Sequence, residues 1–138
     1  MIEINNTTAQ KINQPKIKKI VNDFLVVHKK NNWEVSIAVI SASRMRKLND
    51  DYRGIDKTTD VLSFSGEGRY LGEVIINIEE VKKSHKYLEV FGIKKSAEYI
   101  FYFLLIHGLL HLIGHTDDKE KERARMLKIG ETFLEKYF

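Results

Sequence analysis

The sequence predicts an α+β domain in which a small mixed β-sheet is packed with helices. In the first half of the chain, apolar residues alternate with polar ones or form short β-branched runs, which is typical of strands. In the second half they recur at helical spacing, and the apolar segment 99–113 predicts a buried helix. A chain of 138 residues has the length of one domain, so we expect a single domain over residues 1–138.

The first half is expected to hold three or four strands and two helices. The strand patterns fall at residues 1–4, 33–40, 61–64 and 71–77. We expect the segment 71–77 to be central because it is apolar on both faces. Helical spacing predicts a helix over residues 16–30. A second, short helix could be capped by Ser41 or Ser43 and should end near Gly54.

The second half is expected to be helical. Residues 78 to about 90 have a helical pattern, which Gly92 should end. A long apolar helix is predicted over residues 94–113, with Gly114 as its C-terminal cap. Residues 118–138 predict an amphipathic helix. Its expected buried stripe consists of Met126, Leu127, Ile129, Phe133 and Leu134.

Composition excludes several classes of site and of location. The chain has no Cys, which excludes disulfides, iron–sulfur clusters and thiol catalysis, so any metal must be bound by His, Asp or Glu. The N-terminus lacks a signal-peptide pattern, and the apolar segment 99–113 is shorter than the ~20 residues that span a bilayer. We therefore expect a cytoplasmic protein with no membrane partner. The net charge of +4 lies entirely in residues 1–60, which hold 11 Lys and Arg against 7 Asp and Glu. That bias alone indicates nucleic-acid binding only weakly.

Three histidines lie close together near the end of the predicted buried helix. His107 and His111 are four residues apart, so on a helix their side chains share one face and can bind one cation. Gly114 can let the chain leave the helix and turn back, after which Asp117 can return toward the metal. These offsets are those of metzincin-type zinc sites. We therefore predict a metal site formed by His107, His111 and Asp117, with His115 as the nearby third histidine.

Two other interpretations of the histidines carry less weight. They could be core residues satisfied by hydrogen bonds, but burying two unpaired imidazoles among apolar side chains would be costly. A zinc peptidase would carry its general-base Glu directly after the first His, and this chain has Gly108 there. Proteolysis is therefore disfavoured. His28 and His85 have no comparable context, and we expect both at the surface.

A second informative segment covers residues 48–64. It is a polar loop that runs into a strand, with the sequence Leu-Asn-Asp-Asp-Tyr-Arg-Gly-Ile-Asp-Lys-Thr-Thr-Asp-Val-Leu-Ser-Phe. Arg53 could offer a fork of donors to a phosphate, and Thr58, Thr59 and Ser63 add hydroxyls. Taken alone, such a segment is usually a solvated loop.

Together, these segments resemble the YbeY family of rRNA maturation factors. Residues 107–117 look like the family signature His-Gly-x-Leu-His-Leu-x-Gly-Tyr-Asp-His. Residues 48–64 resemble its Leu-Asn…Tyr-Arg…Asp-x-Pro-Thr-Asp-Val-Leu-Ser-Phe, and residues 71–76 match its Leu-Gly-Asp-Ile strand. The resemblance covers about residues 33–120.

The resemblance implies a zincin-like α+β fold and a zinc-dependent, single-strand-specific endoribonuclease of the cytoplasm. Such a protein acts in rRNA maturation, at the 3′ end of the small-subunit rRNA, and in ribosome quality control. The implied metal ligands include His107 and His111, for one Zn²⁺ per chain, and the implied catalytic and substrate-binding arginine is Arg53. The implied partners are rRNA and the small ribosomal subunit, with ribosomal proteins or GTPases as further candidates.

The departures from the family motifs that bear on the site are at positions 115, 117 and 58. Asp117 stands where the family has its third His ligand, and His115 stands where it has Tyr. We favour Asp117 as the ligand, because on a continued helix His115 would lie two turns, ~12 Å, from His107. A carboxylate makes the site harder, which leaves manganese or nickel as alternatives to zinc. Thr58 replaces a Pro, which should loosen the loop slightly without changing the chemistry.

The expected mechanism is metal-assisted hydrolysis. The site, including His111, would activate a water or polarise a phosphate oxygen, and Arg53 would stabilise the charge that develops. His115 could act as acid or base, and Tyr52 or Phe64 could stack a base. One alternative is a non-catalytic RNA-binding ribosome-assembly factor with a structural zinc. The other is a metallohydrolase of another substrate.

Overall fold

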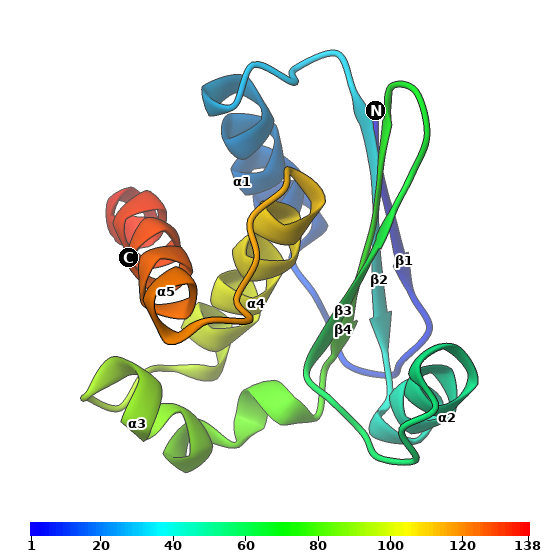
Figure 1. The fold of residues 1–138 in the computed structure, drawn as a ribbon, viewed down its shortest axis with the longest axis vertical. Coiled ribbons are helices and arrows are strands. Elements are labelled where there is room, and N and C mark those ends of the chain that lie inside the picture. Colours follow the sequence, from blue (N-terminus) through cyan, green and yellow to red (C-terminus); the bar gives the residue numbers. More distant parts are fainter.

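The protein folds around a four-stranded mixed sheet, described over residues 1–138 by a computed structural model (Figure 1). The strands are β1 (Ile2–Asn6), β2 (Glu34–Ile40), β3 (Val61–Ser65) and β4 (Tyr70–Asn77). Their order is β1-β2-β4-β3, with β1, β2 and β4 parallel and β3 antiparallel to β4. The predicted mixed sheet and the central place of the fourth strand are therefore confirmed.

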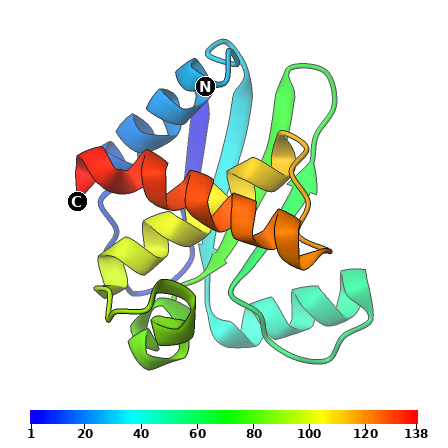
Figure 2. The ribbon, with the colours of Figure 1, turned by 60° about the vertical axis from the view of Figure 1, so that its left-hand side comes forward.

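Helices cover the two faces of the sheet unequally. One face carries α1 (Gln14–Val27) and α4 (Ala97–Leu112), and α5 (Glu120–Leu134) packs on the outer side of α4 (Figures 1 and 2). Between this layer and the sheet lies the main core, a cluster of 26 buried residues. The opposite face carries only α2 (Ala42–Arg53), at one end of the sheet, over a cluster of four buried residues. The predicted α+β class is confirmed.

The first helix spans residues 14–27 where 16–30 was predicted, and the second begins and ends at its predicted signals. The Asn13 side chain caps α1, accepting a hydrogen bond from the backbone N–H of Lys16 at 3.1 Å. Ser41, rather than Ser43, caps α2 by accepting from the N–H of Arg44. α2 ends at Gly54, whose left-handed φ of +69° suits glycine. Arg53 is thereby fixed as the last residue of the helix.

The continuous helix predicted over residues 78–90 is wrong. The chain instead forms two short 3₁₀ helices and one helical turn: Glu80–Lys82, Ser84–Tyr87 and α3 (Leu88–Phe91). Lys83 leaves the helical region with ψ +60°. The Glu80 side chain is 4% exposed, and it accepts from the ammonium groups of Lys83 (2.9 Å) and Lys86 (2.8 Å). Tertiary contacts to a buried carboxylate thus override the local helical pattern. Gly92 ends the segment as predicted, with φ +76°.

The last two helices follow their predictions with shifted ends. α4 begins at Ala97, three residues later than expected, because Ser96 caps it. α5 is shorter than the predicted 118–138, and a 3₁₀ turn, Glu135–Tyr137, follows it. In its predicted stripe, Met126 and Leu134 are buried and the other three residues are half-buried. No helix is long and apolar enough to cross a membrane.

The two isolated histidines differ in their surroundings. His85 is exposed, as predicted. His28 is half-buried, with its ring centroid 4.3 Å from that of Phe24, so its predicted surface position is corrected. Phe24 lies one helical turn before His28, at a position where the sequence shows only the apolar stripe of α1.

Candidate metal centre

The C-terminal end of α4 turns the chain back along the helix. Gly114 has φ +107°. Its N–H donates to the carbonyl of His111 (3.1 Å), and the N–H of His115 donates to the carbonyl of Leu110 (3.0 Å). These two bonds form a Schellman motif, which requires a left-handed residue at the position of Gly114. Because the helix does not continue, the residues after Gly114 return toward His107 and His111.

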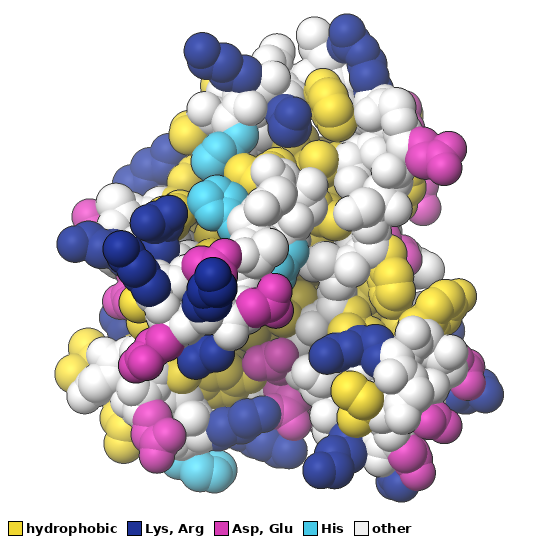
Figure 3. Space-filling model, viewed as in Figure 1, with side chains coloured by type: hydrophobic (Ala, Val, Ile, Leu, Met, Phe, Trp, Pro, Cys, Tyr) yellow, Lys and Arg dark blue, Asp and Glu magenta, His cyan; other side chains and the backbone are white.

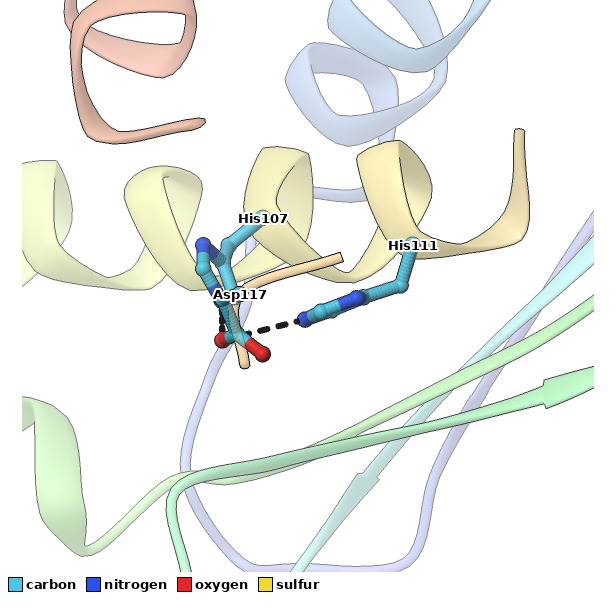
Figure 4. A group of neighbouring side chains, drawn as sticks. All are labelled: His107, His111 and Asp117. Carbon is cyan, nitrogen blue, oxygen red and sulfur yellow. Dashed lines mark hydrogen bonds and ion pairs between the residues drawn. The ribbon is translucent and has the colours of Figure 1, made fainter. Parts of the chain in front are cut away.

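Three side chains meet at this turn (Figure 4). The Nε2 atoms of His107 and His111 lie 3.3 Å and 3.4 Å from the same carboxylate oxygen, Oδ2 of Asp117. The two imidazole planes are nearly perpendicular, at 87°, with ring centroids 4.8 Å apart. One ligand atom from each residue lies within 4.8 Å of the other two. The structure thus brings together the three residues predicted from the sequence.

The spacing of these atoms fits a first-row transition metal. Zinc binds imidazole nitrogen and carboxylate oxygen at about 2.0–2.2 Å, so two such ligands at a tetrahedral angle are separated by roughly 3.3–3.6 Å. The two nitrogen–oxygen distances, 3.3 and 3.4 Å, agree with this value. His107, His111 and Asp117 form a group that could hold a metal ion. With three protein ligands, a tetrahedral ion would keep one position for water or substrate.

His115 supports the group through its backbone. Its carbonyl oxygen lies 3.0 Å from Nδ1 of His111, which places the proton on Nδ1 and leaves Nε2 with a free lone pair. The His115 side chain does not line the cavity at the site. The structure therefore favours Asp117 over His115 as the third member, as the sequence predicted. The suggested acid or base role of His115 finds no geometric support.

Burial sets the charge state of His107. Desolvation, and secondarily the neighbouring His111, lower the pKa of His107 below its usual value, while Asp117 opposes the shift. The Phe103 ring stacks against the His107 imidazole, with 6.0 Å between the ring centroids. The imidazole is therefore neutral at pH 7, the form that binds a metal.

Gly108 shows why a peptidase-type general base is missing. A Cβ atom at this position would lie 2.6 Å from Cγ1 of Val74 and 3.0 Å from Oγ of Ser63. The absence of a Cβ at Gly108 permits this close approach of the helix to the sheet, where Ser63 Oγ donates to the carbonyl of Gly108 at 3.0 Å. A Glu side chain does not fit between α4 and β4. The conclusion that this site lacks the peptidase base thus has a steric reason.

A cavity of about 860 Å³ opens beside the histidines, and Figure 3 shows it as a hollow between the α5 side and the α2 side. The predicted residues Arg53, Thr59 and Ser63 line it together with the His–Asp group. Tyr52 and Phe64 do not; their rings pack against each other, 5.2 Å between centroids, and Tyr52 is 69% exposed. Base stacking by these rings stays a prediction.

Buried amides hold the loop between α2 and β3. Asn49 donates to the carbonyl of Lys57 (2.9 Å), and Asn77 donates to Oγ1 of Thr58 (3.0 Å) and to the carbonyl of Thr59 (3.1 Å). The Thr58 hydroxyl also donates to the carbonyl of Ala42. Thr58 therefore restrains this loop through its hydroxyl, and the slight loosening relative to Pro stays a prediction. Much of the 48–64 motif serves to place the loop beside the cavity.

Three residues that line the cavity were not predicted from the sequence: Asp60, Tyr87 and Arg123. Asp60 accepts from the hydroxyl of Tyr87 at 3.0 Å, and burial, followed by the charge of Asp60, raises the pKa of Tyr87, which stays a donor. Arg123 lines the cavity from the first turn of α5. Tyr87 lies in the segment whose helix prediction was wrong. Arg123 lies in a helix whose charges look like an ordinary solvated face, so the sequence gives no signal for it.

Comparison with known proteins identifies the family. The family model described as endoribonuclease YbeY matches residues 3–138. The chain belongs to the endoribonuclease YbeY family. A relative named endoribonuclease YbeY from Petrotoga mobilis is 35% identical over 127 residues, which cover 90% of this chain and 85% of that protein. The same-named protein of Treponema pallidum is 35% identical over 114 residues, 75% of this chain and 68% of that protein.

The fold is also found among solved structures. The solution structure of TM1509 from Thermotoga maritima aligns with a TM-score of 0.62 and 22% identity, covering 99% of this chain and 91% of that one. Membership of the YbeY family confirms the sequence resemblance, and the mixed sheet with a histidine-bearing helix agrees with the expected zincin-like fold.

Proposed function

We propose that this protein is a zinc-dependent endoribonuclease that cleaves single-stranded rRNA during maturation of the small ribosomal subunit. The proposal rests on family membership together with one structural observation. A group able to hold a metal and an unpaired arginine line the same cavity. Three protein ligands leave a position open, whereas structural zinc sites are closed by four. This observation favours catalysis over a purely structural metal.

The roles of the residues follow from their positions. His107, His111 and Asp117 would hold one Zn²⁺, with Mn²⁺ or Ni²⁺ as alternatives for a site that contains a carboxylate. A bound divalent ion supplies Lewis acidity, which lowers the pKa of a bound water and polarises a phosphoryl oxygen. The Nδ1–H bond from His111 to the His115 carbonyl keeps Nε2 of His111 oriented into the cavity.

Arg53 supplies the positive charge for the substrate. Its guanidinium is exposed at the end of α2 and has no carboxylate within 4.0 Å, so its donors are free for a phosphate. It would bind the phosphate and stabilise the charge that develops on it during cleavage. We assign the protein to the cytoplasm, with rRNA of the small subunit as its partner and ribosomal proteins or GTPases as further candidates.

The test is cleavage of matched single-stranded and duplex RNA by highly purified protein, with and without chelator. We expect cleavage of the single strand only, loss of activity with chelator, and recovery when Zn²⁺ is restored. The variants His111→Ala and Arg53→Ala should each lose at least about 100-fold in rate, the scale of removing one charge-stabilising group.

Arg125→Ala serves as the matched control, because Arg125 is an exposed arginine of α5 that does not line the cavity. It should cleave at the wild-type rate. Cleavage that survives both His111→Ala and Arg53→Ala would come from a contaminant and would refute the proposed function. RNA binding without cleavage in the zinc-loaded protein would instead support the non-catalytic assembly factor.

A further inference from the structure

The cavity has an arginine on each of two walls. Arg53 comes from the last turn of α2, and Arg123 comes from the first turn of α5. The two helices lie on different sides of the molecule in Figure 1, and the space-filling view from the same side shows cationic side chains on both flanks of the hollow (Figure 3). Both arginines are exposed, and neither has a carboxylate oxygen within 4.0 Å. Their donors are therefore free.

The position of Arg123 is not explained by helix stability. A cation in the first turn of a helix opposes the helix dipole, which favours acidic residues there. Glu120 and Glu122 supply that favourable charge in α5, and Glu122 accepts a hydrogen bond from Thr116. Arg123 forms no ion pair with either. Binding of an anionic ligand from outside the chain would account for an arginine at this position.

The charge balance of the cavity makes both arginines important. Four carboxylates line it together with the two arginines: Asp60, Glu89, Asp117 and Glu120. The formal balance is −2, which repels a phosphodiester strand. One divalent ion on the His–Asp group brings the formal charge of the cavity to zero, and loss of Arg123 would then make it −1. The cavity thus repels an RNA backbone least when the ion and both arginines are present.

We propose that Arg123 is a second phosphate-binding residue for the RNA. It would contact the backbone from the α5 wall, Arg53 would contact it from the α2 wall, and the strand would cross the cavity over the His–Asp group. The planar guanidinium suits a phosphate because its fork of donors matches two phosphate oxygens. This inference rests on the proposed function and adds a residue that positions the substrate.

The test compares Arg123→Ala, Arg123→Lys and the control Arg125→Ala in the zinc-loaded full chain. Equilibrium binding is measured by fluorescence anisotropy with a labelled single-stranded 2′-O-methyl RNA oligonucleotide, checked afterwards for intactness. We expect Arg123→Ala to raise Kd about 5- to 20-fold and to reduce the slope of log K against log salt by ~0.7, the value for one lost phosphate contact on a single strand. Arg123→Lys should keep the slope and recover part of the affinity.

Kinetics and metal content separate substrate positioning from a structural effect. Arg123→Ala should raise KM with kcat nearly unchanged and keep one metal per chain, whereas Arg53→Ala should lower kcat as well. If Arg123→Ala matches Arg125→Ala in Kd and in salt slope while Arg53→Ala weakens binding, the inference is overturned and the proposed function stands. If chelator and Arg53→Ala leave RNA binding and cleavage unchanged, the proposed function fails and the inference fails with it.

Discussion

Replacing Gly108 by Ala probes the close approach of α4 to the sheet, on which the position of His107 depends. The new Cβ would lie 2.6 Å from Cγ1 and 3.1 Å from Cγ2 of Val74, and 3.0 Å from Oγ of Ser63. Optimal carbon–carbon contacts are about 3.5–4.0 Å, so the nearest contact is about 1 Å too short. Val74 cannot escape by rotating, because both its methyl groups are involved and the residue is fully buried.

The expected cost is a balance of two effects. Overpacking of this kind costs about 1–3 kcal/mol, and replacing a helical Gly by Ala gains up to about 1 kcal/mol. We expect Gly108→Ala to lower the free energy of unfolding by about 1–2 kcal/mol, which for a chain of this length lowers Tm by roughly 3–8 °C. The measurement is urea unfolding followed by circular dichroism, together with zinc titration. Zinc affinity should also fall, because the helix must shift beside His107.

Gly130 in α5 is the matched control. A Cβ there would meet Phe103 at an ordinary 3.4 Å, so Gly130→Ala should raise Tm slightly through helix propensity alone. In the double variant Val74→Ala/Gly108→Ala, the shorter side chain at position 74 removes the clash with the new Cβ. The double variant should therefore lose less free energy of unfolding than the two single variants lose in total. If Gly108→Ala and Gly130→Ala shift Tm equally, or the cycle is additive, the reasoning is refuted.

Three further predictions concern a buried carboxylate, the helix end and pH. Burial raises the pKa of Glu80, but the hydrogen bonds from Lys86 and Lys83 outweigh burial and hold this pKa below the usual 4.5. The ionised carboxylate therefore stabilises the fold above pH 4.5, and this stabilisation is lost as the pH falls. Glu80→Gln should therefore cost about 1–3 kcal/mol at pH 7, and a Tm difference from wild type that fails to close toward pH 3 would contradict this. Gly114→Ala should cost about 1–2 kcal/mol in urea unfolding and weaken zinc binding, because φ +107° strains any other residue; unchanged values would argue against the turn. Because burial lowers the pKa of His107 below the usual 6.5, proton competition from this residue should weaken zinc binding only below that pH. A zinc affinity that already falls steeply above pH 6.5 in calorimetric titration would contradict this.

The parts of the fold that local pattern determines could be predicted. Alternation and short apolar, β-branched runs located all four strands, and Ser41, Gly54 and Gly114 are start or stop signals whose geometry is local. The histidine spacing predicted the metal group because helix geometry and one turn suffice to bring Asp117 back. No long-range contact was needed for that inference.

What could not be predicted depends on contacts between distant segments. Residues 78–90 carry a helical pattern, yet Glu80 binds two lysines and Tyr87 binds Asp60, which fixes a different path. Arg123 belongs to a helix that the periodicity located correctly, but only packing on α4 places this side chain at the cavity. The local sequence around these residues does not indicate such tertiary contacts.

The most direct test of the central claim is the zinc content of Asp117→Ala, measured by mass spectrometry on the same sample that is assayed for RNA cleavage. We predict that this variant loses zinc and cleavage together. Asp117→His, which introduces the residue of the family signature, should retain both zinc and cleavage. His115→Ala should also retain both, because only the backbone carbonyl of His115 contacts the group. One zinc per chain retained by Asp117→Ala, or full cleavage after zinc is lost, would contradict the account.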